Sequence, residues 1–355
     1  MAGGGTGGHL YPGIAVAREM QRQQPRTVVT FAGTARGIEA RVVPREGFEL
    51  DLIRSSGLKG KSLGARLRSV AELPLSALDA WRLLSRRRPR LVVGVGGYSS
   101  GPVVALAWLR GIPTLLLEQN AVPGLTNRLL ARLVRAAAVT YDQTLPYFRG
   151  KGFLAGNPVR AEFLRPAAPK PAAPGTALGV LIFGGSQGAH AINVACVEAA
   201  AKLAASSTPL AVTHQTGESD LAMVREGYRR SGLAARVEPF LYEMDREMNA
   251  ADLIVCRAGA TTLAEITAAG KPAILVPLPT ATDDHQRKNA DVLARDGAAE
   301  VIDPRDLSGD RLARQILALA ADAPRRQDMA NRARRLARPD AASVIAARAL
   351  ALAGA

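Results

Sequence analysis

Cysteine and aromatic residues are scarce in this sequence of 355 residues, and their scarcity excludes several classes of protein. Two cysteines, Cys196 and Cys256, provide neither a disulfide framework nor the spacing of a metal site, so a reducing cytoplasm is the simplest setting. The N-terminus is rich in glycine and lacks the apolar core of a signal peptide. The most apolar window, residues 91–109, is interrupted by GVGGYSSGP, which predicts a buried strand, loop and helix rather than a membrane span.

Lysine is also rare, because 39 of the 46 basic residues are arginine, and the formal net charge is +15. This excess suggests an anionic partner such as phosphate, nucleic acid or an acidic membrane surface. Arginine together with abundant alanine also fits a biased genome composition, so the charge alone does not identify the partner. Few aromatic residues in a chain that is 48% hydrophobic fit helices packed on parallel sheets, and the length allows two domains with separate cores.

The stretch from residue 253 to residue 289 predicts a βαβ unit with a ligand site. An apolar strand (253–256) leads into a helix that begins near Thr261 and ends at Gly270, and a second strand (273–276) leads to a helix opening near Asp284. Parallel sheets bind ligands where strands end and helices begin, and the uncapped amides there favour anions. The side chains expected to converge on one crevice are Thr262, Glu265, His285, Gln286 and Asn289.

Glu265 has two possible roles in this unit. A carboxylate one turn into a helix can accept two hydrogen bonds from the vicinal hydroxyls of a ribose, which would suit a nucleotide. The alternative is a solvated first-turn acid that the helix dipole favours.

The rest of the chain alternates between strands and helices, which predicts two doubly wound domains. Glycine-rich turns stand at 3–9 (GGGTGGH), 96–101 (GGYSSG) and 184–188 (GGSQG), and a segment rich in Pro and Ala at 156–175 is interpreted as a linker. Such a turn normally follows a strand, but only two residues precede the first one. We therefore expect that the true start lies upstream or that the first strand is missing.

Residues 59–90 combine basic and apolar side chains. A helix of this composition can dock on anionic lipid headgroups. An ordinary arginine-rich helix with a buried apolar stripe explains the pattern equally well, so both interpretations stay open. The basic residues are Lys59, Lys61, Arg66, Arg68, Arg82, Arg86, Arg87, Arg88 and Arg90.

Seven motifs, in this order, resemble the MurG family of N-acetylglucosaminyltransferases over essentially the whole chain: GGGTGGHLYPG, GGYSSGP, EQNAVPGLTN, GNPVR, GGSQGA, CRAGATTLAEI and DDHQRKNA. The resemblance implies an α/β GT-B glycosyltransferase fold, with two Rossmann-like doubly wound domains facing a cleft. Residues 1–159 would form an acceptor and membrane-associating domain, joined by a C-terminal helix (339–355), and residues 160–338 would bind UDP-GlcNAc.

The reaction that the resemblance implies is inverting transfer of GlcNAc from UDP-GlcNAc to the C4 hydroxyl of MurNAc in lipid I (undecaprenyl-pyrophosphoryl-MurNAc-pentapeptide), which yields lipid II. The partners would be these two substrates and an anionic membrane surface, with the protein peripheral on the cytoplasmic face of the plasma (inner) membrane. No cofactor and no nucleic acid is implied.

The resemblance also assigns site residues. Arg160 and Ser186 would meet the diphosphate, Phe240, Leu241 and Met244 the uracil, and Glu265 the ribose, with Ala260, Thr261, Thr262, Leu263 and Ala264 forming the helix start. His285 and Gln286 would lie by the sugar, as would Thr6, Gly7, Gly8 and Asn120. Asn289 would be a further substrate-binding residue, and Tyr98 and Glu118 would be on the acceptor side. The loop ATDDHQ is slightly long, so the choice between His285 and Gln286 stays open.

His9 is the predicted catalytic base, because it is a titratable group on the first glycine-rich turn. His9 could instead only hydrogen-bond that turn, and His190 and His214 have no comparable setting. Asp283 and Asp284 are adjacent acids in a loop, which are usually solvated or capping, so no metal is predicted.

Three alternative functions share part of this pattern. A UDP-GlcNAc 2-epimerase shares this architecture, but it would have no use for an arginine-rich apolar face. A dinucleotide-dependent dehydrogenase would need GxGxxG after a strand, with an acid about twenty residues later. A membrane-docked protein that binds the sugar nucleotide without turnover is the third.

Overall fold

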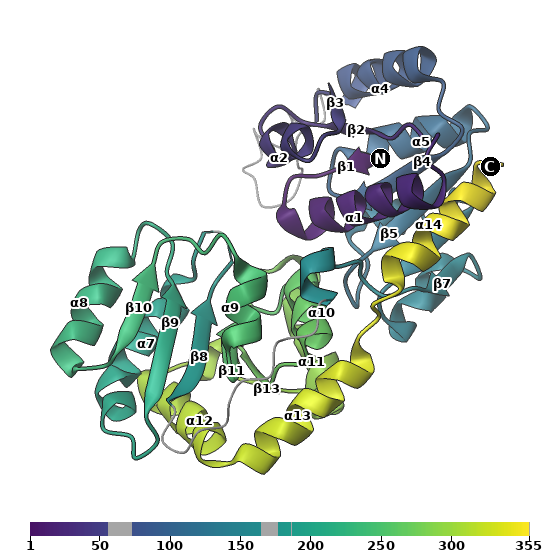
Figure 1. Cartoon of the computed structure of the whole chain (residues 1–355). Helices are drawn as coiled ribbons and strands as arrows, with labels where there is room; N and C mark the ends of the chain where they lie inside the picture. The colour runs from purple at the N-terminus through teal and green to yellow at the C-terminus, as the bar shows by residue number, and fades with distance from the viewer. Residues whose placement is uncertain (56–72, 165–176, 186, 355) are drawn as a thin grey trace. The chain divides into compact units, whose positions relative to one another are not determined.

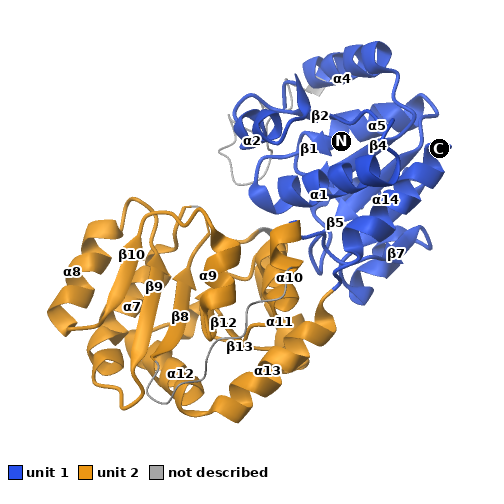
Figure 2. Cartoon of the chain, viewed as in Figure 1, with its two compact units in different colours: residues 1–160, 338–355 blue, residues 161–337 orange. Residues whose placement is uncertain are grey.

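The computed structural model describes residues 1–55, 73–164, 177–185 and 187–354. The chain divides into two compact units, which are coloured separately in Figure 2. Unit 1 comprises Met1–Arg160 together with Arg338–Ala355, and unit 2 comprises Ala161–Ala337. The end of the chain therefore belongs to the same unit as its beginning.

Among the described residues of unit 1, seven parallel strands form one sheet in the order β3-β2-β1-β4-β5-β6-β7 (Figure 1). The strands are β1 (Ala2–Gly3), β2 (Thr30–Gly33), β3 (Glu49–Leu52), β4 (Val92–Gly96), β5 (Thr114–Glu118), β6 (Ala136–Val139) and β7 (Gly152–Leu154). The strand order reverses between β1 and β4. Such a switch point is where open parallel sheets bind ligands.

Helices cover both faces of this sheet. The helices are α1 (Gly7–Gln23), α2 (Glu39–Arg45), α4 (Leu73–Arg87), α5 (Ser100–Leu109), α6 (Leu125–Leu130) and α14 (Ala341–Leu352). Alternate residues of β4 point to opposite faces: Val93 and Val95 pack with Ile345 of α14, whereas Val92 packs with Val104 of α5. Helix α14 thus fills the face that α1 also covers (Figure 1).

The first strand, which the sequence suggested was missing or upstream, is present as β1. It is only two residues long, and it pairs with β2 through Ala2 and Ala32 and with β4 through Ala2 and Gly94. The Met1 ammonium donates to Thr30 O at 2.8 Å, and burial lowers its pKa to about 5. Two residues are too few to show any pattern, so only pairing across the sheet reveals this strand.

Unit 2 has, within its described residues, six parallel strands in the order β10-β9-β8-β11-β12-β13. They are β8 (Leu178–Phe183), β9 (Leu210–Gln215), β10 (Ala235–Glu238), β11 (Leu253–Cys256), β12 (Ala273–Leu275) and β13 (Ala299–Val301). The helices are α7 (His190–Ala204), α8 (Leu221–Ser231), α9 (Met244–Ala250), α10 (Ala260–Ala269), α11 (His285–Arg295), α12 (Gly309–Ala321) and α13 (Ala323–Leu336). The switch point lies between β8 and β11.

These two Rossmann-like sheets confirm the predicted fold class. Strand β11 has the predicted bounds, and Gly270 ends α10 with a φ of 61°. Helix α6 ends at Leu130, and α1 begins at Gly7, within the first glycine-rich turn. None of the helices that the structure describes combines the length and the apolar composition needed to cross a bilayer.

Candidate functional site

The loops after β1 and β4 touch each other at the switch point of unit 1. Gly4 N donates to Gly96 O at 3.3 Å. Gly97 has a φ of +81°, and a Cβ there would lie 2.5 Å from Gly4 O, so only glycine allows this approach. Helices α1 and α5 begin directly after these loops, and neither has a side-chain cap or an acid in its first turn. The edge of the sheet therefore presents backbone amides suited to a polar or anionic group.

His9, the predicted base, lies in the first turn of α1 and is half-buried at this switch point. Its ring packs on Gly96, where a Cβ would lie 2.6 Å from His9 Nδ1. His9 Nδ1 is 3.1 Å from Gln119 Oε1, and Gln119 Nε2 donates to Val95 O at 3.1 Å. The structure thus connects the first glycine-rich loop to the residue after β5.

Glu39 holds the first glycine-rich loop, a role that the sequence analysis missed. Its carboxylate is 1% exposed and accepts hydrogen bonds from Gly5 N at 2.7 Å, Thr34 N at 2.9 Å and Thr34 Oγ1 at 2.8 Å. Burial alone would raise the pKa of Glu39, but these bonds and its own amide hold the pKa below its usual value. Gly4, Gly33 and Gly37 surround the carboxylate so closely that a Cβ on any of them would strike it.

Glu118 organises the loop that carries Asn120. It is 3% exposed and accepts hydrogen bonds from Asn120 N at 3.0 Å, Gly124 N at 3.1 Å and Asn127 Nδ2 at 2.9 Å. Burial raises the pKa of this carboxyl. Glu118 and Gln119 are both buried, so these polar side chains after β5 also take part in the packing of unit 1.

In unit 2, α10 begins beside the switch point with no side-chain cap and no acid in its first turn. Glu265 lies in the second turn and is only 7% exposed, so the solvated first-turn acid considered for it is wrong. Burial raises the pKa of Cys256 at the end of β11, and the nearby charge of Glu265 adds to this. Because the Glu265 carboxylate is largely shielded from water, its interactions with charges and with hydrogen-bond donors are screened little and are therefore strong.

Two side chains of α11 hold the loop before α10, and a third side chain ties that loop to the segment after β12. Gln286 Oε1 accepts hydrogen bonds from Ala258 N at 3.2 Å and Leu278 N at 2.9 Å, and the fully buried Asn289 donates to Ala258 O at 3.4 Å. Arg257, a residue the sequence analysis did not select, donates to Val276 O at 3.1 Å and Pro277 O at 3.0 Å. Gln286 and Asn289 therefore both contact Ala258, two residues before α10.

The turn after β8 is fixed by the neighbouring strands. Gln215, buried at the end of β9, donates to Gly185 O at 3.0 Å and Pro239 O at 3.2 Å. A Cβ on Gly188, whose φ is +75°, would lie 1.9 Å from Thr216 O. Helix α7 starts immediately afterwards, again without a side-chain cap or a first-turn acid. The turn and α7 together form a second uncapped helix start in unit 2.

His190 and His214 belong to one polar network. His190 Nδ1 lies 3.0 Å from the Asp220 carboxylate, and Asn193 Nδ2 donates to Asp220 at 2.7 Å. Asn193 Oδ1 is 3.0 Å from His214 Nε2, and His214 Nδ1 is 2.7 Å from the Tyr228 hydroxyl. Burial lowers the pKa of His214 to about 3, so this ring is neutral. The network connects the exposed start of α7 to the core.

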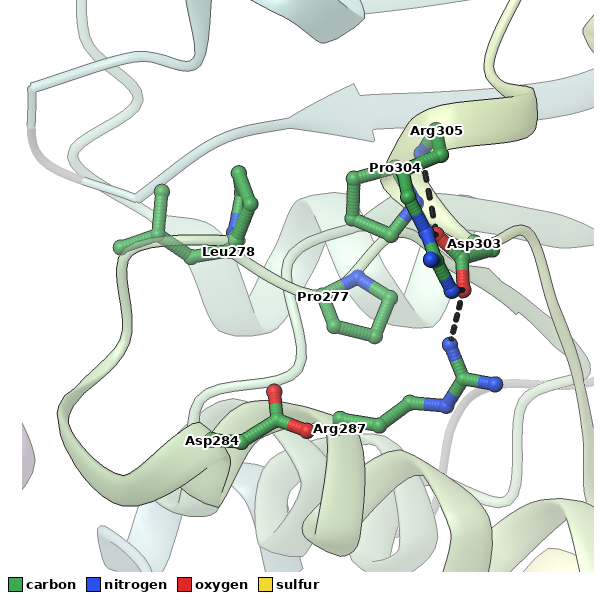
Figure 3. A pocket seen from close by; sticks show the side chains of 8 residues that line it. Pro277, Leu278, Asp284, Arg287, Asp303, Pro304 and Arg305 are labelled. Atoms are coloured by element: carbon green, nitrogen blue, oxygen red, sulfur yellow. Dashed lines mark hydrogen bonds and ion pairs between the residues drawn. The ribbon is translucent and has the colours of Figure 1, made fainter.

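A pocket of about 520 Å³ lies at the ends of β12 and β13 (Figure 3). Its lining is Pro277, Leu278, Pro279, Asp284, Arg287, Asp303, Pro304 and Arg305. Asp303 pairs with Arg305 and Arg287, which hold its pKa below the usual range, so the charges of the pocket are largely paired internally. In the parts of the chain that the structure describes, no three His, Cys, Asp or Glu side chains gather as a metal site would need.

Comparisons with known proteins bear on both units. The model of the glycosyltransferase family 28 N-terminal domain matches residues 1–139, and that of the C-terminal domain matches residues 179–345. A relative from Anaeromyxobacter sp. (strain K) is 48% identical over 98% of this chain and 90% of its own length. It is named UDP-N-acetylglucosamine–N-acetylmuramyl-(pentapeptide) pyrophosphoryl-undecaprenol N-acetylglucosamine transferase. The crystal structure of Acinetobacter baumannii MurG matches with a TM-score of 0.81 and 31% identity, covering 98% of each chain. The chain belongs to the MurG family.

Membership of the MurG family also identifies the fold as GT-B. A UDP-N-acetylglucosamine 2-epimerase structure matches with a TM-score of 0.67 at 12% identity, covering 97% of this chain and 93% of its own. That likeness shows a shared fold alone.

The residues that the MurG resemblance assigned to substrate binding differ from one another in exposure and in packing. Leu241 and Leu263 are buried in the core of unit 2, so only their backbones are available to a ligand, whereas Phe240 is exposed and packs edge-on against Tyr242. Thr6 precedes α1, Tyr98 is exposed, and the Arg160 guanidinium lies over the Tyr11 ring. Ser186 lies outside the described residues. His285 and Gln286 both open α11.

Proposed function

We propose that this protein catalyses inverting transfer of GlcNAc from UDP-GlcNAc to the C4 hydroxyl of MurNAc in lipid I, forming lipid II for peptidoglycan synthesis. The observation that carries the proposal is 48% identity over 98% of the chain to a protein named as this transferase. The two switch-point edges support it, because each offers uncapped helix starts and buried polar side chains.

Unit 2 binds the donor in this proposal. The diphosphate lies at the start of α7 and α10, where backbone amides and the helix dipoles favour negative charge. Glu265 accepts both ribose hydroxyls. Phe240 and Met244 lie beside the uracil, and His285 or Gln286 contacts the sugar. Because Gln286 Oε1 already accepts two backbone hydrogen bonds, the Nε2 amide group of Gln286 would donate to the sugar hydroxyls.

Unit 1 binds the acceptor and supplies the base. His9 takes the proton of the C4 hydroxyl while the C4 oxygen attacks C1 of the donor sugar from the face opposite UDP. The C1–oxygen bond to the diphosphate breaks, UDP departs with the electron pair, and the configuration at C1 changes from α to β. The helix dipoles stabilise the charge that develops on the diphosphate.

The membrane contact is proposed on α4 and α5. Exposed apolar side chains gather on these helices: Leu75, Leu78, Trp81, Trp108 and Leu109. The Arg110 guanidinium lies 4.8 Å from the centre of the Trp81 ring, which combines a cation with the apolar surface. Such a face suits anionic lipid and would place the protein peripherally on the cytoplasmic face of the plasma (inner) membrane.

Two basic residues of α4 are already paired with an acid. Arg86 and Arg87 pair with Asp51, so they are partly neutralised. Lys59, Lys61, Arg66 and Arg68 lie outside the described residues. The exposed apolar side chains are therefore the better targets for testing membrane binding.

Incubating the protein with radiolabelled UDP-GlcNAc and a short-chain lipid I analogue tests the proposal. We expect labelled lipid II and UDP in equal amounts. An epimerase would instead yield an epimeric sugar nucleotide without the lipid, and a simple binding protein would retain UDP-GlcNAc unchanged. Either of these results would reject the transferase assignment.

A further inference from the structure

We propose that Gln119 is a positioning residue that fixes the tautomer of His9, so that His9 Nε2 carries the basic lone pair. The inference rests on the proposed function of His9 as the catalytic base. It assigns to Gln119 a role separate from substrate contact, because this side chain is only 2% exposed.

The amide of Gln119 can have only one orientation. Its Nε2 donates to Val95 O at 3.1 Å, and reversing the amide would set two carbonyl oxygens against each other. Gln119 Oε1 therefore faces His9 Nδ1, at 3.1 Å. A carbonyl oxygen can only accept a hydrogen bond, so His9 Nδ1 must carry the proton. A neutral imidazole has one N–H, which leaves its lone pair on Nε2.

The backbone that orients Gln119 also supports the His9 ring. Val95 O accepts from Gln119, and the next residue, Gly96, packs directly beneath the ring. A Cβ on Gly96 would lie 2.6 Å from His9 Nδ1, so the ring has no room to shift toward the strand. The end of β4 thus sets both the partner of His9 and the position of its ring.

A neutral amide suits a base that must gain a proton during the reaction. When His9 Nε2 takes the proton of the acceptor hydroxyl, Nδ1 keeps its hydrogen bond, and that bond becomes charge-assisted and stronger. A carboxylate in place of Gln119 would already stabilise the imidazolium before the reaction, and a protonated ring cannot act as base. The amide orients the ring without adding that charge.

Nuclear magnetic resonance of protein labelled with ¹⁵N-histidine tests the tautomer directly, because the chain has only four histidines. Spectra are recorded at a pH where the ring of His9 is neutral, and His9→Gln identifies the signals of His9. We expect the proton on Nδ1 of the unliganded parent protein. A neutral ring with its proton mainly on Nε2, or shared between both nitrogens, would overturn the proposal.

Two variants of Gln119 separate positioning from simple packing. In Gln119→Leu the acceptor is lost, so we expect a smaller Nδ1–H population and a turnover lower by about 10- to 100-fold, with UDP affinity unchanged. In Gln119→Glu the acceptor remains, so Nδ1 should stay protonated. The acid limb of the pH–rate profile should then move to higher pH, because the carboxylate stabilises the imidazolium. Gln21→Leu, which removes a half-buried amide elsewhere on α1, should change neither property.

The outcomes for Gln119 and for His9 are distinguishable. If Gln119→Leu keeps both the tautomer and the turnover of the parent, the positioning role is refuted, even when His9→Gln is inactive. If His9→Gln retains full turnover, His9 is not the catalytic base. Gln119 then has no positioning role in catalysis, and the proposal is refuted. The transferase assignment depends on neither result, because it is tested by product formation.

Discussion

Replacing Glu265 by alanine should weaken binding of UDP by roughly 10- to 100-fold. The carboxylate would lose two hydrogen bonds to the ribose, and hydrogen bonds to a charged group are worth about 1.5 to 3 kcal/mol. Glu265 is only 7% exposed, so water screens the interaction little, and the upper part of this range is the better expectation. Glu265→Gln keeps the shape but loses the charge and one acceptor, so its effect should be intermediate.

Calorimetry of UDP binding to the parent and to each variant measures this effect. Glu226→Ala is a matched control, because it removes the same charge from an exposed position on α8 of the same unit. A UDP analogue without the two ribose hydroxyls should bind the parent and Glu265→Ala about equally. Melting curves check that each variant is folded. Equal dissociation constants for UDP in the parent and in folded Glu265→Ala would refute the ribose contact.

Four further predictions concern unit 1. His9→Ala should lower turnover by about 10- to 1000-fold while UDP affinity stays near normal, and unchanged turnover would leave His9 with only a structural role. Gly96→Ala should lower turnover by roughly 10-fold or more, because the new Cβ would displace the His9 ring, whereas Gly111→Ala, whose Cβ meets no atom, should alter stability alone. Glu39→Gln should reduce the free energy of unfolding by about 1 to 3 kcal/mol at neutral pH. The pKa of Glu39 is held below its usual value of 4.5, so its stabilisation is present above that pH and is lost as the pH falls through the lowered pKa. Urea denaturation should therefore separate parent and variant at neutral pH and bring them together in strong acid, and a constant difference would contradict the reasoning. Replacing Trp81 and Leu109 by alanine should weaken sedimentation with anionic vesicles by roughly tenfold or more, since each large apolar side chain contributes about 1.5 to 3 kcal/mol when fully buried. Tyr242→Ala, which removes an exposed aromatic ring from unit 2, should have no such effect.

Local chemistry explains why much of the fold could be predicted. Strands β8 and β11 are buried on both faces of a parallel sheet, so each appears in the sequence as an unbroken apolar run with clear ends. Gly270 ends α10 because its left-handed backbone favours glycine. The prediction failed where a segment is too short or too rich in glycine to show a pattern. Strand β1 has only two residues, and α1 begins within the glycine-rich turn. The motifs that carry the MurG resemblance also lie in continuous segments, so the family could be recognised from them.

By itself, then, the sequence determined the fold class, the family and the segments that form the site, because each depends on residues close together in the chain. Only the tertiary structure decided how those segments are held. Glu39 meets Gly5 across 34 residues, and Gln119 meets His9 across 110, so no local pattern connects either pair. The burial of Glu265 likewise comes from packing, since its place one turn into a helix is equally compatible with solvent. In unit 1 these hydrogen-bond partners come together because parallel strands align their ends at one edge of the sheet, and that alignment is a property of the folded chain.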